Sequence, residues 1–133
     1  MNPATQRAVF AEVGRRSLWW FLLYAFGIRE HCKRIGDDNW WDDRVHKGLA
    51  DDIQTCIEEW ETRRLQGVRE PMDILVMAFR GFGKSTFGCG VDLWLQVRNP
   101  NLSEVLSSFD EKKSVEFLNV DKTYLEGEAN FGW

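Results

Sequence analysis

The chain has 133 residues, of which 44% are hydrophobic and seven are tryptophan. This composition is typical of a globular domain with a buried core, and it excludes an intrinsically disordered chain. The net charge of −4 at pH 7 and the pI near 5.2 argue against a dedicated nucleic-acid-binding module, although they do not exclude a larger DNA-handling machine.

The cysteines and the most apolar stretch exclude further classes of protein. Cys32, Cys56 and Cys89 are widely spaced without a Cys-x-x-Cys pair, so we expect reduced thiols and neither a disulfide framework nor a zinc site. Residues 18–26 are too few to span a bilayer, which needs about 20 residues, and no signal-peptide cleavage site follows. We predict a buried helix there, with an interfacial or partner-binding helix as the alternative.

Two helices are predicted in the first half of the chain. Residues 5–26 carry apolar side chains mostly at three- or four-residue steps, and Gly27 ends the pattern. Residues 41–66 give the clearest helical periodicity, and Gly67 ends it. The apolar stripe of this second helix consists of Trp41, Val45, Leu49, Ile53, Ile57 and Trp60. Residues 1–70 are therefore predicted to form an N-terminal helical segment.

The second half of the chain predicts strands that alternate with helices. Residues 74–77 form a continuous apolar run that indicates a strand buried on both faces, and residues 105–109 predict a shorter strand. Residues 84–97 and 111–125 predict the intervening and following helices. The resulting fold class is α/β, an incomplete parallel sheet of the P-loop NTPase type, of which residues 71–133 are the start.

A phosphate-binding loop is predicted between the first strand and its helix. Gly81 and Gly83 permit positive φ angles, so that successive N–H groups and the start of the helix form an anion cradle. Lys84 supplies a cation for the β- and γ-phosphates, Ser85 supplies a hydroxyl for Mg²⁺, and Thr86 can donate to another phosphate oxygen. The pattern predicts binding of ATP with Mg²⁺.

Two features separate this loop from a complete ATPase site. Ala78 stands where the standard pattern has glycine, and the alternative is a helix that begins Gly-Lys-Ser by coincidence. Hydrolysis also needs an acid for Mg²⁺, and the candidate Asp110 is better explained as a helix N-cap. Since few elements can follow Thr86, we expect the chain to be the N-terminal part of a larger protein.

Residues 79–86, Phe-Arg-Gly-Phe-Gly-Lys-Ser-Thr, resemble the loop of the large terminase subunit of tailed bacteriophages. That family often carries Pro-Arg-Gly-(aromatic or His)-Gly-Lys-Ser-Thr, and Phe79 replaces the frequent proline. The resemblance covers residues 40–125, in which Trp41 and His46 precede an apolar helix as they do in the family.

The resemblance implies the ATP-binding part of a viral DNA-packaging motor, an ATPase that drives DNA translocation. Lys84 and Arg80 would be catalytic, with Arg80 reaching the γ-phosphate, and Ser85 would bind Mg²⁺. The implied nucleotide-binding residues are Arg80, Gly81, Phe82, Gly83, Lys84, Ser85 and Thr86. Trp41 or His46 would stack on adenine, unless Trp41 belongs to the core and His46 is a satisfied or exposed histidine.

The same resemblance implies partners and a location. The complete protein would bind double-stranded DNA, the portal protein and the small terminase subunit, with no membrane, as a homo-oligomeric ring. It would act in the host cytoplasm and transiently at the procapsid. The acid pair and the nuclease domain of the family are missing from these residues. Two alternatives stay open: another P-loop ATPase, helicase-like or AAA-type, and a non-enzymatic interaction domain with a vestigial phosphate loop.

Overall fold

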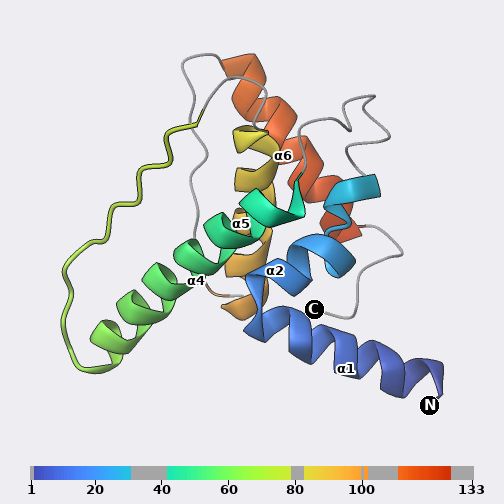
Figure 1. Cartoon of the computed structure of the whole chain (residues 1–133), viewed down its shortest axis with the longest axis horizontal. Coiled ribbons are helices and arrows are strands. Elements are labelled where there is room, and N and C mark those ends of the chain that lie inside the picture. Colours follow the sequence, from blue (N-terminus) through green and yellow to red (C-terminus); the bar gives the residue numbers. More distant parts are fainter. Residues whose placement is uncertain (1, 31–41, 79–82, 100, 102–110, 127–133) are drawn as a thin grey trace.

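The computed structural model describes residues 2–30, 42–78, 83–99, 101 and 111–126. The elements, shown in Figure 1, are α1 (Pro3–Arg16), α2 (Leu18–Trp20), η1 (Phe21–Ala25, a π-helix), α4 (Asp43–Leu65), α5 (Lys84–Arg98) and α6 (Glu111–Glu126). Within these ranges the protein is mostly helical and contains no strand. The predicted α/β fold with a P-loop-type parallel sheet is therefore wrong for the described part of the chain.

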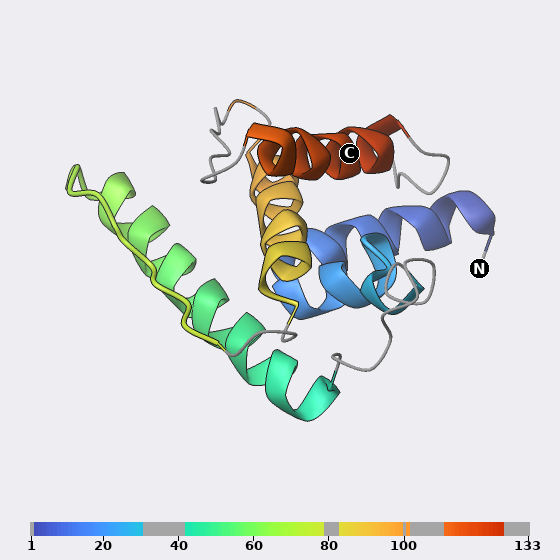
Figure 2. The same cartoon turned by 90° about the horizontal axis from the view of Figure 1, so that it is seen from above.

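The segment that was predicted as the first strand has no strand partner among the described residues. It runs extended beside α4 (Figure 2). Leu75 and Met77 are 83% and 84% exposed, whereas Ile74 and Val76 are 45% and 36% exposed. This alternation belongs to an extended backbone whose two sides differ in exposure. The prediction of a strand buried on both faces is wrong, because each of these four residues is at least 36% exposed. The second predicted strand, 105–109, lies outside the described residues.

The single long helix predicted at the start of the chain breaks at Ser17. This residue has extended backbone angles, φ −131° and ψ 116°, and its Oγ accepts the Trp20 N–H at 3.3 Å. A serine in this position caps the start of a new helix, so α1 ends and α2 begins. The chain then continues into η1, where the Phe26 N–H donates to the Phe21 carbonyl oxygen at 2.8 Å.

Gln54 of α4 holds the break between α1 and α2. Its side-chain oxygen accepts the Leu18 N–H at 3.0 Å, and its amide nitrogen donates to the Arg16 carbonyl oxygen at 2.8 Å. Helix ends leave such backbone groups without intrahelical partners, so one side chain satisfies both sides of the break. The contact spans more than 30 residues of sequence, which is why helical periodicity does not reveal it.

The hydrophobic core lies where α2 and η1 meet α4 and α5. The segment predicted as a buried helix, 18–26, supplies much of it, although Trp20 and Tyr24 remain exposed and contact each other. The other main contributors are Ile28, Ala50, Ile53, Ile57, Phe87, Leu93, Trp94 and Val97. The core therefore joins helices from both halves of the sequence.

Trp94 and Arg98 connect α5 to α1 and α4. The Trp94 side chain is fully buried, and its Nε1–H donates to the Gly14 carbonyl oxygen at 2.9 Å. The Arg98 guanidinium lies 4.6 Å from the centre of the Trp94 ring. It also donates to the Arg15 carbonyl oxygen at 2.9 Å and to a Glu61 carboxylate oxygen at 2.6 Å. These bonds fix the C-terminal end of α5 against two other helices.

The helices predicted at the positions of α4, α5 and α6 are confirmed, with ends that agree within a few residues. Some side chains that their spacing places on an apolar face are nevertheless exposed. Val45 was assigned to the apolar stripe of α4 and is 52% exposed. In α6, Val115 and Leu118 are 48% and 57% exposed, while Phe117 and Val120 pack against the core. The helix α6 crosses α5 (Figures 1 and 2). The face of α6 that packs inward is therefore the one with Phe117 and Val120, and the face with Val115 and Leu118 is exposed.

Candidate functional site

The predicted phosphate-binding turn leads into the N-terminus of α5. Gly83 has φ 79° and ψ 28°, a left-handed conformation that glycine adopts without steric cost. Its carbonyl oxygen accepts the Phe87 N–H at 2.9 Å, so the helix begins at Lys84. Gly83 has no side chain to cap the first turn. The N–H groups of that turn, with the positive end of the helix dipole, are therefore suited to an anion.

The other predicted site residues divide between described and undescribed parts of the chain. Ser85 is exposed and Thr86 is half-buried, both in the first turn of α5. Arg80, Gly81 and Phe82 lie outside the described residues. Lys84, Ser85 and Thr86 therefore form the first turn of α5, and their predicted roles stay predictions.

The surroundings of this helix end differ from those of the predicted site. The phosphates were expected at the carboxyl end of a sheet strand, but residues 74–77 form no sheet with any described part of the chain. The candidate acid Asp110 lies outside the described ranges. Within those ranges, no group of three or more His, Cys, Asp or Glu residues is close enough to hold a metal ion.

The structure tests the predicted adenine contact for only one of the two candidate residues. Trp41 lies outside the described residues. His46 is 1% exposed, and its Nδ1 lies 2.9 Å from the carbonyl oxygen of Asp42. Its ring centre is 6.2 Å from that of Phe87 in the first turn of α5. The prediction of a satisfied histidine is confirmed, and its burial excludes stacking on a nucleotide base in this conformation.

Asp92 is an acid that motif reasoning missed. It lies on α5 beside the cavity between α4 and α5, and burial raises the pKa of its carboxyl to about 6. An aspartate within a largely apolar helix is the only sequence signal for it. Asp92 follows Ser85 by two helical turns, roughly 10 Å along the axis. That separation is too long for Asp92 and the Ser85 hydroxyl to share one Mg²⁺ ion.

We predict that Asp92→Asn stabilises the protein at neutral pH. The carboxyl has a pKa of about 6 in the folded protein and 3.8 in the unfolded chain, so its ionisation destabilises the folded state increasingly as the pH rises from about 4 through 6. The full shift corresponds to about 3 kcal/mol. Because the side chain is only half-buried, we expect about 1 to 2 kcal/mol after solvent screening.

Urea unfolding at pH 4 and pH 7.5 measures this effect. The advantage of Asp92→Asn should be about a fifth of its full value at pH 4 and complete at pH 7.5. Asp52→Asn, which changes an exposed acid of α4, is the matched control and should stay within about 0.5 kcal/mol. An equal difference between Asp92→Asn and wild type at both pH values would contradict the assigned burial.

Comparisons of the chain with protein-family models, with curated proteins and with solved structures give no significant match. Among the helices that the structure describes, none combines the length and apolar character needed to cross a membrane.

Proposed function

We propose that the chain binds the phosphates of ATP at the N-terminus of α5, as the nucleotide-binding part of a DNA-packaging motor similar to the large terminase subunit. The observation that carries the proposal is the left-handed Gly83 directly before a helix that begins Lys84-Ser85-Thr86. Backbone N–H groups and a lysine at such a helix end favour a phosphate chain. The proposal rests on the loop and the helix start, and it requires no sheet.

Each residue of the first turn has a distinct role in this proposal. The Lys84 ammonium neutralises the β- and γ-phosphates, and the Thr86 hydroxyl donates to a phosphate oxygen. The exposed Ser85 hydroxyl suits one position around Mg²⁺, which takes its other oxygens from phosphates and water. Arg80 contributes a second cation at the γ-phosphate. Because no group of three or more His, Cys, Asp or Glu residues in the described part of the chain is close enough to hold a metal ion, binding is expected to exceed turnover.

Lys84→Ala should weaken nucleotide binding by an order of magnitude or more, since charge-assisted contacts to phosphate are the strong ones. Titration with a fluorescent ATP analogue and Mg²⁺ measures this. Alanine is a good helix former, so α5 should persist, as circular dichroism can verify. Lys122→Ala, on the exposed surface of α6, is the control and should bind like wild type. Equal affinities of Lys84→Ala and wild type would overturn nucleotide binding at this helix end.

The non-enzymatic alternative has an observation in its favour. The apolar side chains of Leu75 and Met77 are exposed directly before the loop, where a P-loop enzyme would have a buried strand. A domain with a vestigial loop would use such side chains to contact another protein. This alternative predicts that the wild-type chain shows no saturable ATP binding in the same titration.

A further inference from the structure

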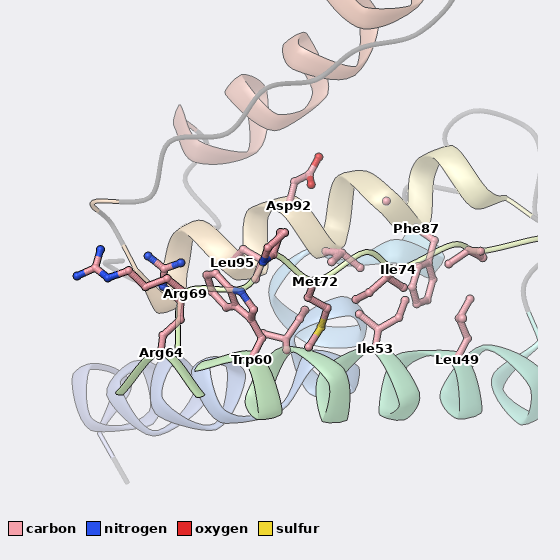
Figure 3. A pocket seen from close by; sticks show the side chains of 15 residues that line it. Leu49, Ile53, Trp60, Arg64, Arg69, Met72, Ile74, Phe87, Asp92 and Leu95 are labelled. Atoms are coloured by element: carbon pink, nitrogen blue, oxygen red, sulfur yellow. The ribbon is translucent and has the colours of Figure 1, made fainter. Parts of the chain in front are cut away.

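A cavity of about 620 Å³ lies between α4, α5 and the extended segment that connects them (Figure 3). Its apolar walls include Leu49, Ile53 and Trp60 from α4 and Phe87, Val91 and Leu95 from α5. Met72 and Ile74 form part of the third wall. Along α4 the lining reaches from Leu49 to Arg64, roughly 22 Å at 1.5 Å per residue. The space is an elongated apolar channel.

The side chains that line this cavity restrict what can occupy it. Among the described residues that line the cavity, Arg64, Arg69 and Asp92 are the charged ones, and none has an amide or hydroxyl side chain. A peptide or a nucleoside in the channel would bury many polar groups against mainly apolar side chains, at substantial cost. An alkyl chain has no such groups. The walls therefore favour an occupant whose body is purely hydrocarbon.

The charged groups are distributed unevenly along the channel. Arg64 and Arg69 lie together at one end, near Trp60, whereas Asp92 projects from the side of α5 that faces away from α4 (Figure 3). The Arg64 guanidinium lies 4.8 Å from the centre of the Trp60 ring. Among the residues that the structure describes, neither Arg64 nor Arg69 forms an ion pair, in contrast to Arg98. Two exposed guanidinium groups at one end of an apolar channel complement an anionic head group.

We propose that this cavity binds a single-chain amphiphile with an anionic head, such as a fatty acid. The alkyl chain lies between α4 and α5, and the carboxylate lies between Arg64 and Arg69. The two arginines set the orientation, because they place the positive charge at one end of the channel. Lys84 does not line the cavity, so this proposal can be tested independently of nucleotide binding.

Gly88 offers a way to fill the cavity without disturbing the fold. It lines the channel on α5, and a Cβ atom built there meets no atom within 4 Å. Gly88→Leu should therefore place an isobutyl group in the channel and weaken decanoate binding at least tenfold in calorimetric titration. Gly48→Leu is the matched control, because Gly48 lies on α4 outside the lining and also has open space around its Cβ position. It should bind decanoate like wild type.

A second set of variants tests whether Arg64 and Arg69 bind the carboxylate head. Arg64→Gln combined with Arg69→Gln should weaken decanoate binding about tenfold and leave binding of the uncharged 1-decanol unchanged. Arg63→Gln, a neighbouring exposed arginine outside the lining, should change neither. Lys84→Ala should also leave decanoate binding unchanged, which separates this cavity from the nucleotide site.

Three results would overturn the proposal. The first is no decanoate binding to the wild-type chain, and the second is equal binding by wild type and Gly88→Leu. The third is sedimentation of the wild-type chain as a dimer that Gly88→Leu dissociates, since the channel would then be an interface with a second copy.

Discussion

Trp94→Ala should lower the free energy of unfolding by about 3 to 5 kcal/mol, the usual cost of removing a large aromatic side chain from a core. Trp94 is fully buried and donates a hydrogen bond to the Gly14 carbonyl oxygen. The substitution leaves a cavity, an unsatisfied buried carbonyl and an Arg98 guanidinium without its aromatic neighbour. Urea unfolding followed by far-ultraviolet circular dichroism measures the change without relying on tryptophan emission.

Two further variants separate the components of that cost. Trp94→Phe keeps most of the apolar volume and loses the N–H donor, so it should cost about 1 to 3 kcal/mol. Trp20→Ala removes a tryptophan that is 41% exposed, and it should cost clearly less than Trp94→Ala. Similar losses for Trp94→Ala and Trp20→Ala would mean that Trp94 does not join α5 to α1.

The helices were predictable because each carries its own local signals. Gly67 ends α4 with φ 85°, and Gly27 follows η1 with φ 68°, as their positions after periodic segments predicted. The break at Ser17 was missed because the apolar periodicity continues across it. What stabilises that break is Gln54, a side chain far away in sequence. Local patterns predict where helices form, and long-range contacts decide where they are interrupted.

The missing sheet has a different physical origin. An apolar run such as residues 74–77 indicates a strand only if another strand is available to pair with its backbone. Among the described residues none is, and Ile74 and Val76 instead line the cavity that lies between the run, α4 and α5. The run predicted an extended backbone correctly, but its predicted burial is wrong, since even Val76, the least exposed of the four residues, is 36% exposed. Pairing depends on the rest of the fold and is not encoded in the run.

At the candidate site, the loop sequence predicted the local backbone conformation but not the surroundings of the helix end. It predicted that Gly83 can adopt a positive φ and that a helix starts at Lys84. It did not predict the cavity beside Phe87 or the burial of Asp92, because both arise from how α5 lies against α4. The motif describes one helix end, whereas the cavity depends on three segments that meet in space.

Gly90→Ala should destabilise the protein by about 1 to 3 kcal/mol, although alanine normally stabilises a helix interior. Gly90 is buried on the face of α5 that contacts η1. A Cβ atom there would lie 2.3 Å from Leu22 Cδ2 and 3.3 Å from Phe26 Cδ1. Because Leu22 is fully buried, it has little room to move away. Thermal and urea unfolding measure the loss.

Gly88→Ala is the matched control for Gly90→Ala, one half-turn away on the same helix. No atom lies within 4 Å of its Cβ position, so alanine should stabilise α5 by about 0.5 to 1 kcal/mol. The two substitutions are chemically identical, and the opposite signs that we expect can arise only from what surrounds each position. Stabilisation by both would mean that η1 does not pack closely on α5.

A double-mutant cycle with Leu22→Ala identifies the responsible contact. Leu22→Ala alone should cost about 2 to 5 kcal/mol, because it removes a fully buried side chain. It also removes the Cδ2 atom that the new methyl group would meet, so Gly90→Ala should be nearly neutral or stabilising in that background. The expected interaction energy is about 1 to 3 kcal/mol, well above the error of additivity for independent sites. A value near zero would locate the strain elsewhere, against Phe26 or the helix backbone. The sign and size of this coupling therefore test directly how η1 packs on α5, the helix that begins at Lys84.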